Sequence, residues 1–492
     1  MHPDFAYPEN SSENLGRFKT LIETRTGLMF NGHREHALLK GLHTAAQRTE
    51  VIDQEGYYEH LESQNTTSIV WDDLIGELTI GETYFFRNAS HFDALEHDLI
   101  PRLLARHQRN RRLRIWSAGC STGEEAYSLA ILLHRMLPDI ANWNIHILAT
   151  DINRSALRRA RLASYRQWSF REGAPEIQKR YFNQVEDTYE LIQPIRDVVT
   201  FAYLNLAENS YPSLTTNTNA MDLILCRNVA IYLPESVNRV IAGRFYRSLS
   251  PEGWLIMGAS ETNIDVFRQF KSVNIKGATL YQKSATTGTV IRPVKLQHIE
   301  SQPIPNLPAI VPPSQAIELA SPPTPPAINT ETDCFQNGLS MMKHKRYEEA
   351  QNYFLACIKN SPANAVAYYQ IARLQANTGY LTNALTWLKQ ALQRDSLMVE
   401  AQYTMAMIYQ ERGEVDQAIS QFKKTLYLNP NFVLAHFGLA GLYQRMGRTQ
   451  LAERHRSQAS RLAMQLPQDD ELPASDGMTA GQLLKMMQAT HY

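Results

Sequence analysis

The residues with the clearest chemical meaning lie at 115–125, where the sequence reads IWSAGCSTGEE. Glycines at 119 and 123 let the backbone bend tightly and let a ligand approach it closely. The start of a following helix offers free N–H groups and the positive end of the helix dipole. This combination is typical of a cradle for a nucleotide-like cofactor. Because the full G-x-G-x-x-G spacing is missing, a dinucleotide is not the first expectation.

The elements that must position this turn can be read on either side of it. An apolar strand is expected over 113–116 and a helix over 124–135, so the turn joins a strand to a helix. A second buried strand is expected over 144–150, and it ends in Asp151. An acid at the tip of this strand can accept hydrogen bonds from both ribose hydroxyls of an adenosine cofactor. The alternative role for Asp151 is the N-cap of the next helix, and both roles are compatible.

Two further expected strands, 222–226 and 198–204, are followed by residues that can face a ligand. These residues are Arg227 and Asn228 after the first strand, and Asn205 and Leu206 after the second. In open α/β sheets the ligand crevice lies beyond the carboxyl ends of the strands, so all of them should converge with Asp151 near the glycine turn. Each signal alone is more often a loop cap. Four signals at successive strand ends favour a ligand site.

Several motifs extend this pattern along the chain. In order, they are GETYFFR at 81–87, HF at 91–92, WSAGCSTGEE at 116–125, YS at 127–128, ATDI at 149–152, WSFR at 168–171, NL at 205–206, CRNV at 226–229 with Tyr232, and GASE at 258–261. Through these motifs residues 14–284 resemble the chemotaxis-receptor glutamate O-methyltransferases, the CheR family. The resemblance implies a Rossmann-like fold that binds S-adenosylmethionine, releases S-adenosylhomocysteine and methylates receptor glutamates.

The resemblance also implies a cofactor shell, residue by residue. This shell is Thr83, Arg87, Glu125, Asp151, Asn205, Leu206, Arg227 and Asn228. Gly81 stands where some family members have asparagine, so no side-chain contact is carried over there. Lys40, Gly41 and Leu42 stand near the place where the family often has an Arg-Leu pair, so the substrate contact of that pair is not carried over either.

The implied chemistry needs an aligned acceptor but no general base. A methyl group on the sulfonium of S-adenosylmethionine is electrophilic, and a glutamate carboxylate is already ionised at pH 7. The enzyme must therefore align and partly desolvate that carboxylate. We expect Arg87 or Tyr232 to hold one carboxylate oxygen while the other attacks, which makes these two the candidate catalytic residues. The alternatives are a surface ion pair for Arg87 and core packing for Tyr232.

Composition and charge fit a modular protein. The chain has 492 residues, with 49 Lys and Arg against 49 Asp and Glu, so no overall charge favours nucleic acid or a membrane. We recognise no signal peptide and no membrane-spanning run, and the four cysteines lack C-x-x-C spacing. We therefore expect a cytoplasmic protein without disulfides or a metal site. The arginine-rich run at 102–114 suggests a solvated helix face, or a surface that steers an acidic receptor.

Five segments are expected along the chain. They are an all-α domain at 1–75, an α/β Rossmann-like methyltransferase domain at 76–284, a Pro-rich linker at 285–331, all-α repeats at 332–465 and a flexible tail at 466–492. In the first segment, short amphipathic helices are expected over 15–26 and 57–64. In the tail, residues 481–489 can form a short helix.

The segment 332–465 repeats every 34 residues. Alanines recur at 350, 384, 418 and 452, and glycines at 379, 413 and 447. Small residues let two helices pack closely, and glycine makes the turn between them. The pattern resembles tetratricopeptide repeats, with an unrelated helical bundle as the alternative. His455 and Arg456 stand where an apolar residue should pack, which suits a capping unit.

Together these features predict a protein-glutamate O-methyltransferase that forms glutamate methyl esters on chemoreceptors and tunes chemosensory adaptation. The substrate would be the cytoplasmic helices of a receptor. The repeats would recruit a further protein as a separable module, held at a distance from the active site by the linker. The alternative is a scaffold or cofactor-sensing protein that acts mainly through its repeats. A weaker alternative is methylation of a small acid or a nucleic acid on the same fold.

Overall fold

The computed structural model describes residues 12–49, 51, 53–66, 68–171, 175–284, 331–343, 346–475 and 477–488. The expected Pro-rich linker at 285–331 therefore lies outside the described residues, apart from residue 331. The chain divides into two compact units. One holds residues 1–286, 376–380 and 402–492, and the other holds residues 287–375 and 381–401.

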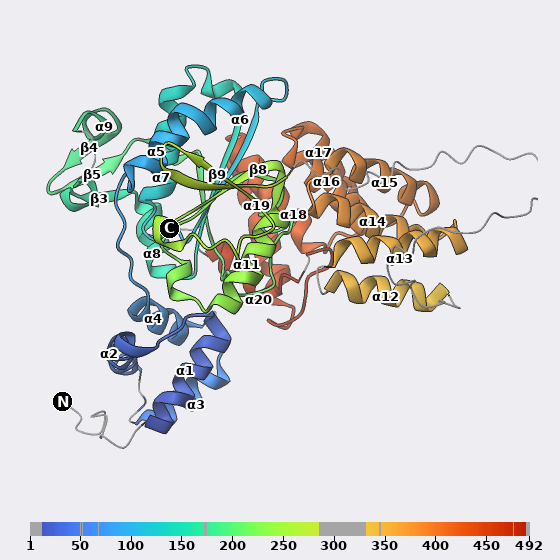
Figure 1. Ribbon diagram of the computed structural model, residues 1–492. Helices are drawn as coiled ribbons and strands as arrows, with labels where there is room; N and C mark the ends of the chain where they lie inside the picture. Colours follow the sequence, from blue (N-terminus) through green and yellow to red (C-terminus); the bar gives the residue numbers. More distant parts are fainter. Residues whose placement is uncertain are drawn as a thin grey trace, which may run out of the picture. The chain divides into compact units, whose positions relative to one another are not determined.

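The first unit is built on a central sheet flanked by helices (Figure 1). The sheet has seven strands in the order β6-β2-β1-β7-β8-β10-β9. The strands are β1 (Arg112–Ala118), β2 (Asn144–Asp151), β6 (Val199–Tyr203), β7 (Met221–Cys226), β8 (Leu249–Met257), β9 (Lys271–Ile275) and β10 (Ala278–Gln282). Neighbours from β6 to β8 run parallel, whereas β10 is antiparallel to both β8 and β9. Because β2 lies on one side of β1 and β7 on the other, the order reverses at β1, where open α/β sheets bind their ligands.

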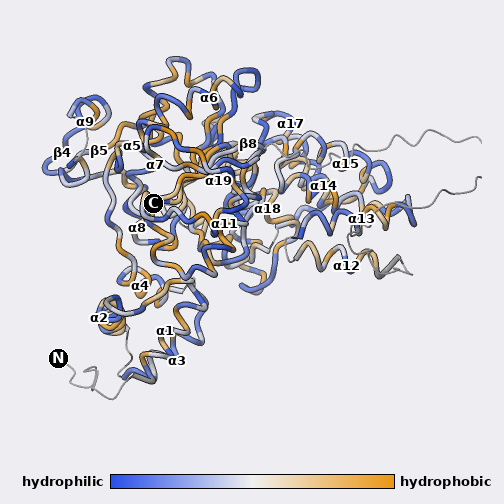
Figure 2. The backbone as a smooth tube through the Cα atoms, in the orientation of Figure 1, coloured by the Kyte–Doolittle hydropathy of each residue, from blue (hydrophilic) through white to orange (hydrophobic). Residues whose placement is uncertain are grey.

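The burial of the strands explains why this sheet is central. Every residue of β1 after Arg112 is buried, and so is every residue of β7, as expected for parallel strands covered on both faces. Ile115 and Trp116 enter different hydrophobic cores, one on each face of the sheet. Figure 2 shows hydrophobic segments through the middle of this unit. With α7 (Glu124–Met136) following the turn, the expected strand, turn and helix around 113–135 are confirmed.

Four helices form the N-terminal helical region in the described part of the chain. They are α1 (Ser12–Thr26), α2 (Glu35–Ala46), α3 (Gln54–Ser63) and α4 (Ile69–Leu78). Their apolar side chains belong to the same core as Trp116, so the helical region and the sheet share one hydrophobic interior. Asp72 of α4 pairs with Arg154 of α8 (Arg154–Leu162) at 2.6 Å, which ties the helical region to the end of β2. Helix α4 runs on to Leu78, past the expected boundary at residue 75.

A second sheet was not anticipated from the sequence. It has three antiparallel strands in the order β3-β5-β4, with α9 (Pro175–Tyr181) preceding β4. The strands are β3 (Ser164–Arg166), β4 (Phe182–Val185) and β5 (Thr188–Leu191). The rings of Phe85, Phe170 and Phe182 lie 4.9–5.1 Å apart between centroids. Because Phe85 belongs to the GETYFFR motif, this aromatic cluster fixes that segment against the small sheet.

The arginine-rich run at 102–114 does not form one helix face. Between α4 and β1 lie α5 (Ala89–Ala94), a π-helical turn (Leu95–Leu99) and α6 (Ile100–Arg106), and α6 ends within the run. Arg102 pairs with Asp98 on the surface, whereas Arg114 lies in β1 and is only 4% exposed. The interpretation as one solvated helix face is therefore wrong. Arg112 and Arg114 also lie at the amino end of β1, away from the carboxyl end where a ligand would bind, which argues against steering by these two residues.

The C-terminal region consists of helical pairs. They are α12 (Glu331–Lys343), α13 (Tyr347–Asn360), α14 (Ala365–Asn377), α15 (Leu381–Arg394), α16 (Val399–Glu411), α17 (Val415–Leu428), α18 (Val433–Arg445) and α19 (Thr449–Met464). The sheet region also contains α10 (Gln193–Arg196) and α11 (Glu235–Ser248). Alanines 350, 384, 418 and 452 are fully buried, and glycines 379, 413 and 447 have positive φ. A Cβ on Gly438 would lie 2.5 Å from the ring of Phe422, which shows why this position must be small. The repeat of helix, turn and helix is confirmed.

His455 occupies the place in α19 where an apolar residue was expected. Its ring stacks on Tyr443 with 5.7 Å between centroids, and its Nδ1 lies 2.9 Å from Nδ1 of His436. Burial, followed by the charge of the neighbouring His436, lowers the pKa of His455 to about 4. Neutral imidazole rings can thus fill the position that an apolar side chain fills in the other repeats.

The described part of the tail is more ordered than the flexible segment expected at 466–492. Glu471 and Thr479 form an isolated antiparallel bridge, and α20 (Ala480–Gln488) follows. Leu483 and Met487 are buried because α20 packs against α19. Among the described residues, we find no helix with the length and apolar character needed to cross a membrane.

Candidate functional site

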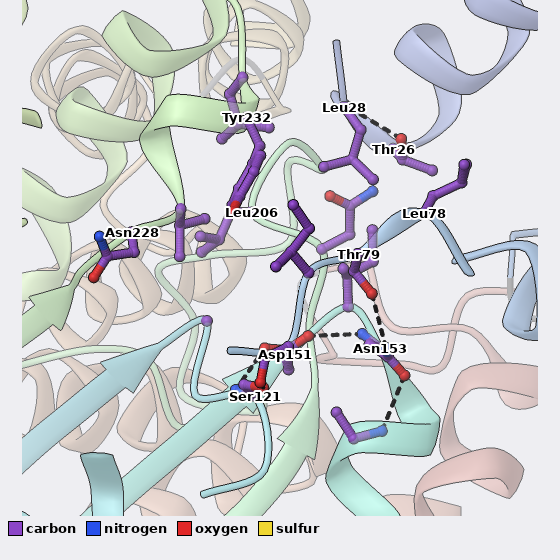
Figure 3. A pocket seen from close by; sticks show the side chains of 18 of the residues that line it. Thr26, Leu28, Leu78, Thr79, Ser121, Asp151, Asn153, Leu206, Asn228 and Tyr232 are labelled. Carbon is purple, nitrogen blue, oxygen red and sulfur yellow. Dashed lines mark hydrogen bonds between the residues drawn. The ribbon is translucent and has the colours of Figure 1, made fainter. Parts of the chain in front are cut away.

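Two adjoining cavities lie at the carboxyl ends of β1, β2, β6 and β7. The first, with about 790 Å³ of empty space, is shown in Figure 3 and is lined by residues that include Thr26, Leu28, Arg34, Leu78, Asp151, Asn205, Leu206, Tyr232 and Leu233. The second, with about 460 Å³, is lined by residues that include Thr83, Tyr84, Arg87, Phe92, Glu125 and Arg227. Both are lined by Ile80, Gly119, Ser121 and Asn228, so the glycine turn stands at their junction.

The two glycines of the turn have different roles. Gly119 has φ +84° and lines both cavities, and a Cβ there would lie 2.3 Å from Val229. Gly123 has φ +94°, but a Cβ there would meet Ala160 and Phe201 at 3.0 and 3.1 Å. Gly119 therefore faces both cavities and is also required for close packing against Val229. Gly123 is needed for close packing of α7 against α8 and β6, which differs from the role first expected for it.

Asp151 lies at the tip of β2 on the floor of the first cavity. One carboxylate oxygen accepts a hydrogen bond from the backbone N–H of Ser121 and the other from that of Asn153, both at 2.8 Å (Figure 3). Each oxygen keeps a lone-pair site that can accept a hydroxyl. The N-cap role is wrong for Asp151, because Asn153 caps α8 by accepting from Ala156 at 2.9 Å. Burial raises the pKa of Asp151, and these N–H contacts partly offset that rise.

Asn205 and Leu206 follow β6 and contribute in different ways. The Asn205 amide donates to the backbone carbonyl of Arg25 at 3.0 Å, and its oxygen accepts from Ala207 at 3.0 Å. Asn205 thus holds the end of α1 beside the first cavity. Leu206 joins Leu28 and other leucines in the apolar wall of that cavity, a surface suited to a flat aromatic base.

A buried ion pair closes the second cavity. Arg227 Nη1 lies 3.2 Å from Oε2 of Glu125, and the other Glu125 oxygen accepts from the Ser117 hydroxyl at 2.6 Å. The Arg227 side chain is only 2% exposed, and burial lowers its pKa. Its Nη2 also donates to the backbone carbonyl of Arg87, so the pair connects β7, α7 and the GETYFFR segment.

Cys120 and His91, two residues with reactive side chains near the ion pair, are buried and neutral. Cys120 is 1% exposed, and burial raises the pKa of its thiol well above the ordinary value. Cys120 is therefore a packed side chain and not a nucleophile. His91 is 2% exposed, and burial, followed by the charge of Arg227, lowers its pKa to about 4. Neither the thiol nor the imidazole is therefore charged at pH 7.

Thr83 and Arg87 reach the second cavity from the GETYFFR segment. Arg87 is half-buried, and its Nη1 donates to the backbone carbonyl of Glu82 at 2.7 Å. Its guanidinium lies 5.6 Å from the centroid of the Tyr84 ring. These contacts use one edge of the guanidinium, so other N–H groups remain available to an anion in the cavity.

The loop after β7 is held by a residue that was quoted as part of a motif but not placed in the site. Glu261 accepts backbone hydrogen bonds from Asn228 at 2.6 Å, Gly258 at 2.8 Å and Ile231 at 3.2 Å. Asn228 has φ +60° and lines both cavities. Glu261 thus fixes the backbone that presents Asn228 and Tyr232. The only signal for it in the sequence was the GASE motif itself.

Tyr232 lies in the first cavity and is held by a residue that sequence reasoning missed. The guanidinium of Arg34 lies 4.7 Å from the centroid of the Tyr232 ring and 4.6 Å from that of Phe30. Its Nη1 donates to the carbonyl of Met29 at 2.6 Å, and the N–H of Met29 donates to the carbonyl of Tyr232 at 2.9 Å. Sequence reasoning gave no reason to single out Arg34, because this contact joins residues far apart in the chain.

The structure brings most of the expected residues to one crevice but divides them between its two cavities. Asp151, Asn205, Leu206 and Tyr232 line the first, and Thr83, Arg87, Glu125 and Arg227 line the second. Asn228 lines both. The two candidate catalytic residues therefore line different cavities, Tyr232 the first and Arg87 the second. One cavity can hold a nucleoside while a charged group and an acceptor meet in the other.

Comparisons with known proteins identify a family for the cofactor-site region and for the repeats. A family described as CheR methyltransferase, SAM binding domain, matches residues 81–278, and tetratricopeptide repeat families match residues 335–398 and 399–432. A chemotaxis protein methyltransferase of Borreliella burgdorferi is 35% identical over 42% of this chain and 72% of its own length. That of Escherichia coli is 33% identical over 56% of this chain and 92% of its own length. Chemotaxis protein methyltransferase 2 of Vibrio cholerae is 30% identical over 54% and 91%.

Among solved structures, the crystal structure of MamA covers 28% of this chain and 80% of its own, with a TM-score of 0.26 and 20% identity. This similarity is too low to add to the repeat assignment.

Proposed function

The chain belongs to the CheR family of chemotaxis protein methyltransferases, which use S-adenosylmethionine, and we propose that it methylates glutamate side chains of chemoreceptor cytoplasmic helices. The product would be a glutamate methyl ester that tunes chemosensory adaptation. The observation that carries this proposal is the pair of cavities that meet at Gly119 and Asn228. One offers a carboxylate and an apolar wall to a nucleoside, and the other offers Arg87 to an acidic acceptor.

The residues of the first cavity fit the adenosine part of S-adenosylmethionine. Asp151 has one free acceptor position on each oxygen, which suits the two ribose hydroxyls. Leu28 and Leu206 offer an apolar surface to the base. In the second cavity, Glu125 carries a buried negative charge that suits an ammonium group, while Thr83 adds a hydroxyl. Gly119 lines both cavities, so the middle of the cofactor would lie beside its backbone.

The protein's part in the reaction is alignment. S-adenosylmethionine supplies an electrophilic methyl group on its sulfonium. A glutamate carboxylate is already ionised at pH 7 and needs no general base. Arg87 holds one oxygen of the acceptor with its free N–H groups, and Tyr232 adds its hydroxyl from the first cavity. Both interactions orient the second oxygen for in-line attack and replace part of its hydration.

Asp151→Asn should weaken the binding of S-adenosylhomocysteine by roughly 10- to 150-fold. The change removes hydrogen bonds to a charged acceptor, which contribute about 1.5–3 kcal/mol. Titration calorimetry measures the affinity. Asp139→Asn is the control, because Asp139 makes an exposed pair with Arg111 far from the cavities. Equal affinity in folded Asp151→Asn and wild-type protein would remove Asp151 from the site.

The same binding should depend on pH. Burial raises the pKa of Asp151, so its carboxyl group stays protonated up to a higher pH than that of an ordinary aspartate. Only the ionised form accepts from both hydroxyls. The affinity for S-adenosylhomocysteine should therefore be highest above the raised pKa of Asp151 and should fall as the pH is lowered through that pKa. The Asp151→Asn variant should lack this component of the pH profile.

The proposed product can be tested by its stability. Labelled methyl groups on a receptor fragment should be released as methanol in mild base, because carboxyl esters hydrolyse and N-methyl groups do not. A fragment whose accepting glutamates are changed to alanine is the matched control and should take up no label. Base-stable label on the fragment would argue for a nitrogen acceptor and against the proposal.

For the repeats we propose a role in binding a further protein, which keeps the enzyme near its substrate. Repeats of this kind stack into surfaces that bind other proteins. A scaffold that acts through its repeats alone is disfavoured, because the crevice retains the buried ion pair and the free carboxylate positions of a working cofactor site. We further propose that the enzyme works in the cytoplasm, where receptor helices of this kind are accessible.

A further inference from the structure

Three positions of the repeats recur every 34 residues and point to a second role for the turns between helices. Asn377, Glu411 and Arg445 each stand two residues before the turn glycine of their repeat. The first two contact the sheet-bearing part of the first unit. We propose that these turns form a docking ridge that fixes the repeats to the amino ends of β1, β2 and β7. The repeats would then be a fixed bracket, not the freely tethered module first expected.

Glu411 is the centre of the docking ridge. One of its carboxylate oxygens accepts from Arg112 Nη2 at 2.7 Å and lies 3.9 Å from Arg114 Nε. The other accepts from the Asn219 amide at 2.9 Å. The Glu411 side chain is 4% exposed, and those of Arg112 and Arg114 are 15% and 5% exposed. A charge pair this deeply buried is a specific contact, because each charge would be costly to bury without its partner.

The turn one repeat earlier makes contacts of its own with the same end of the sheet. The Asn377 side-chain oxygen accepts from the N–H of Leu214 at 3.3 Å, and the Asn219 amide also donates to the carbonyl of Ala376 at 3.5 Å. Leu214 and Asn219 belong to the loop that leads into β7. Two turns that stand one repeat apart thus contact the same end of the sheet.

The space around the turn glycines shows which of them are needed for docking as well as for the turn itself. A Cβ on Gly379 would lie 3.0 Å from Cβ of Ala220, and one on Gly413 would lie 2.9 Å from Nδ2 of Asn144. A Cβ on Gly447 would have nothing within 4 Å among the described residues. All three glycines have positive φ, which the turn requires. Only Gly379 and Gly413 are also pressed against the first residues of the sheet, so this closeness is not a general feature of the repeat.

The docking ridge lies at the opposite end of the strands from the crevice. Arg112 begins β1, whereas Gly119 follows its last residue, and the same strand separates the two sites. Docking therefore leaves the cofactor cavities open. It also places any protein bound by the docked repeats at a constant position with respect to the crevice, which a flexible tether cannot do.

Cutting the full chain after it has folded tests this proposal. A protease site is inserted after residue 300, and the cleaved protein is passed over a sizing column at micromolar concentration. The two fragments should elute together and dissociate only at lower concentration. Separate elution of the wild-type fragments would overturn the proposal.

Variants on each side of the contact make the test specific. Glu411→Gln should raise the dissociation constant between the fragments by roughly 10- to 1,000-fold, because it removes the charge from a buried pair. Glu414→Gln is the matched control, since Glu414 pairs with Arg412 of its own repeat. Arg112→Ala should weaken the complex from the other side, and the double variant should be less than additive. Equal affinity for Glu411→Gln, Glu414→Gln and wild type would also overturn the proposal.

Discussion

Arg227→Gln should lower the free energy of unfolding by about 3–5 kcal/mol, because it leaves the Glu125 charge buried without its partner. The Arg227 side chain is 2% exposed and lies 3.2 Å from Glu125, and its Nη2 also donates to the carbonyl of Arg87. Loss of these contacts should loosen the GETYFFR segment as well as the pair. Denaturant unfolding measures the change, and S-adenosylhomocysteine binding should weaken with it.

Arg102→Gln is the matched control for this expectation. Arg102 pairs with Asp98 at 3.3 Å, but its side chain is 62% exposed. Water and salt screen such a pair, so its removal should change the free energy of unfolding by less than about 1 kcal/mol. If Arg227→Gln were as mild as Arg102→Gln, the buried pair would not be what holds the second cavity together.

The strand ends of the crevice could be predicted because their signals are local. The expected strands at 113–116, 144–150 and 222–226 correspond to β1, β2 and β7. Each is a short apolar run that ends in a polar residue, and such runs become buried parallel strands. The crevice then follows from the sheet order, since parallel strands end at the same edge. This placed Asp151 and Asn228 beside Gly119 without any knowledge of tertiary contacts.

Residues that act through tertiary contacts could not be predicted in this way. Arg34 meets Tyr232 across nearly two hundred positions of the chain, and Glu261 reaches back to the loop after β7. The small sheet was missed because β3 has only three residues, Ser164–Arg166, which carry too little pattern to identify a strand. Adjacent arginines also have different fates: Arg111 pairs on the surface, whereas Arg114 is buried. Composition alone cannot separate such neighbours.

The geometry around Tyr232 explains why its hydroxyl can be tested separately from its ring. The ring is packed against Arg34, and the backbone carbonyl of Tyr232 is held by Met29. Removing the hydroxyl changes neither contact. The ring position should therefore survive in Tyr232→Phe, and so should the apolar wall of the first cavity. A loss of activity in this variant would therefore come from the missing hydroxyl and not from a displaced ring.

Tyr232→Phe should lower kcat by roughly 10- to 150-fold while the melting temperature and the affinity for S-adenosylhomocysteine stay close to wild type. This range corresponds to one hydrogen bond to a charged group, about 1.5–3 kcal/mol. Arg34→Met should have a partial effect of the same kind, because the ring would lose its support but keep its hydroxyl. Tyr58→Phe is the control, since the Tyr58 hydroxyl binds Glu62 on an exposed face. Unchanged methyl transfer in both Tyr232→Phe and Arg87→Ala would show that other groups align the carboxylate. A fall in cofactor affinity with constant kcat would instead assign Tyr232 to the cofactor and not to the acceptor.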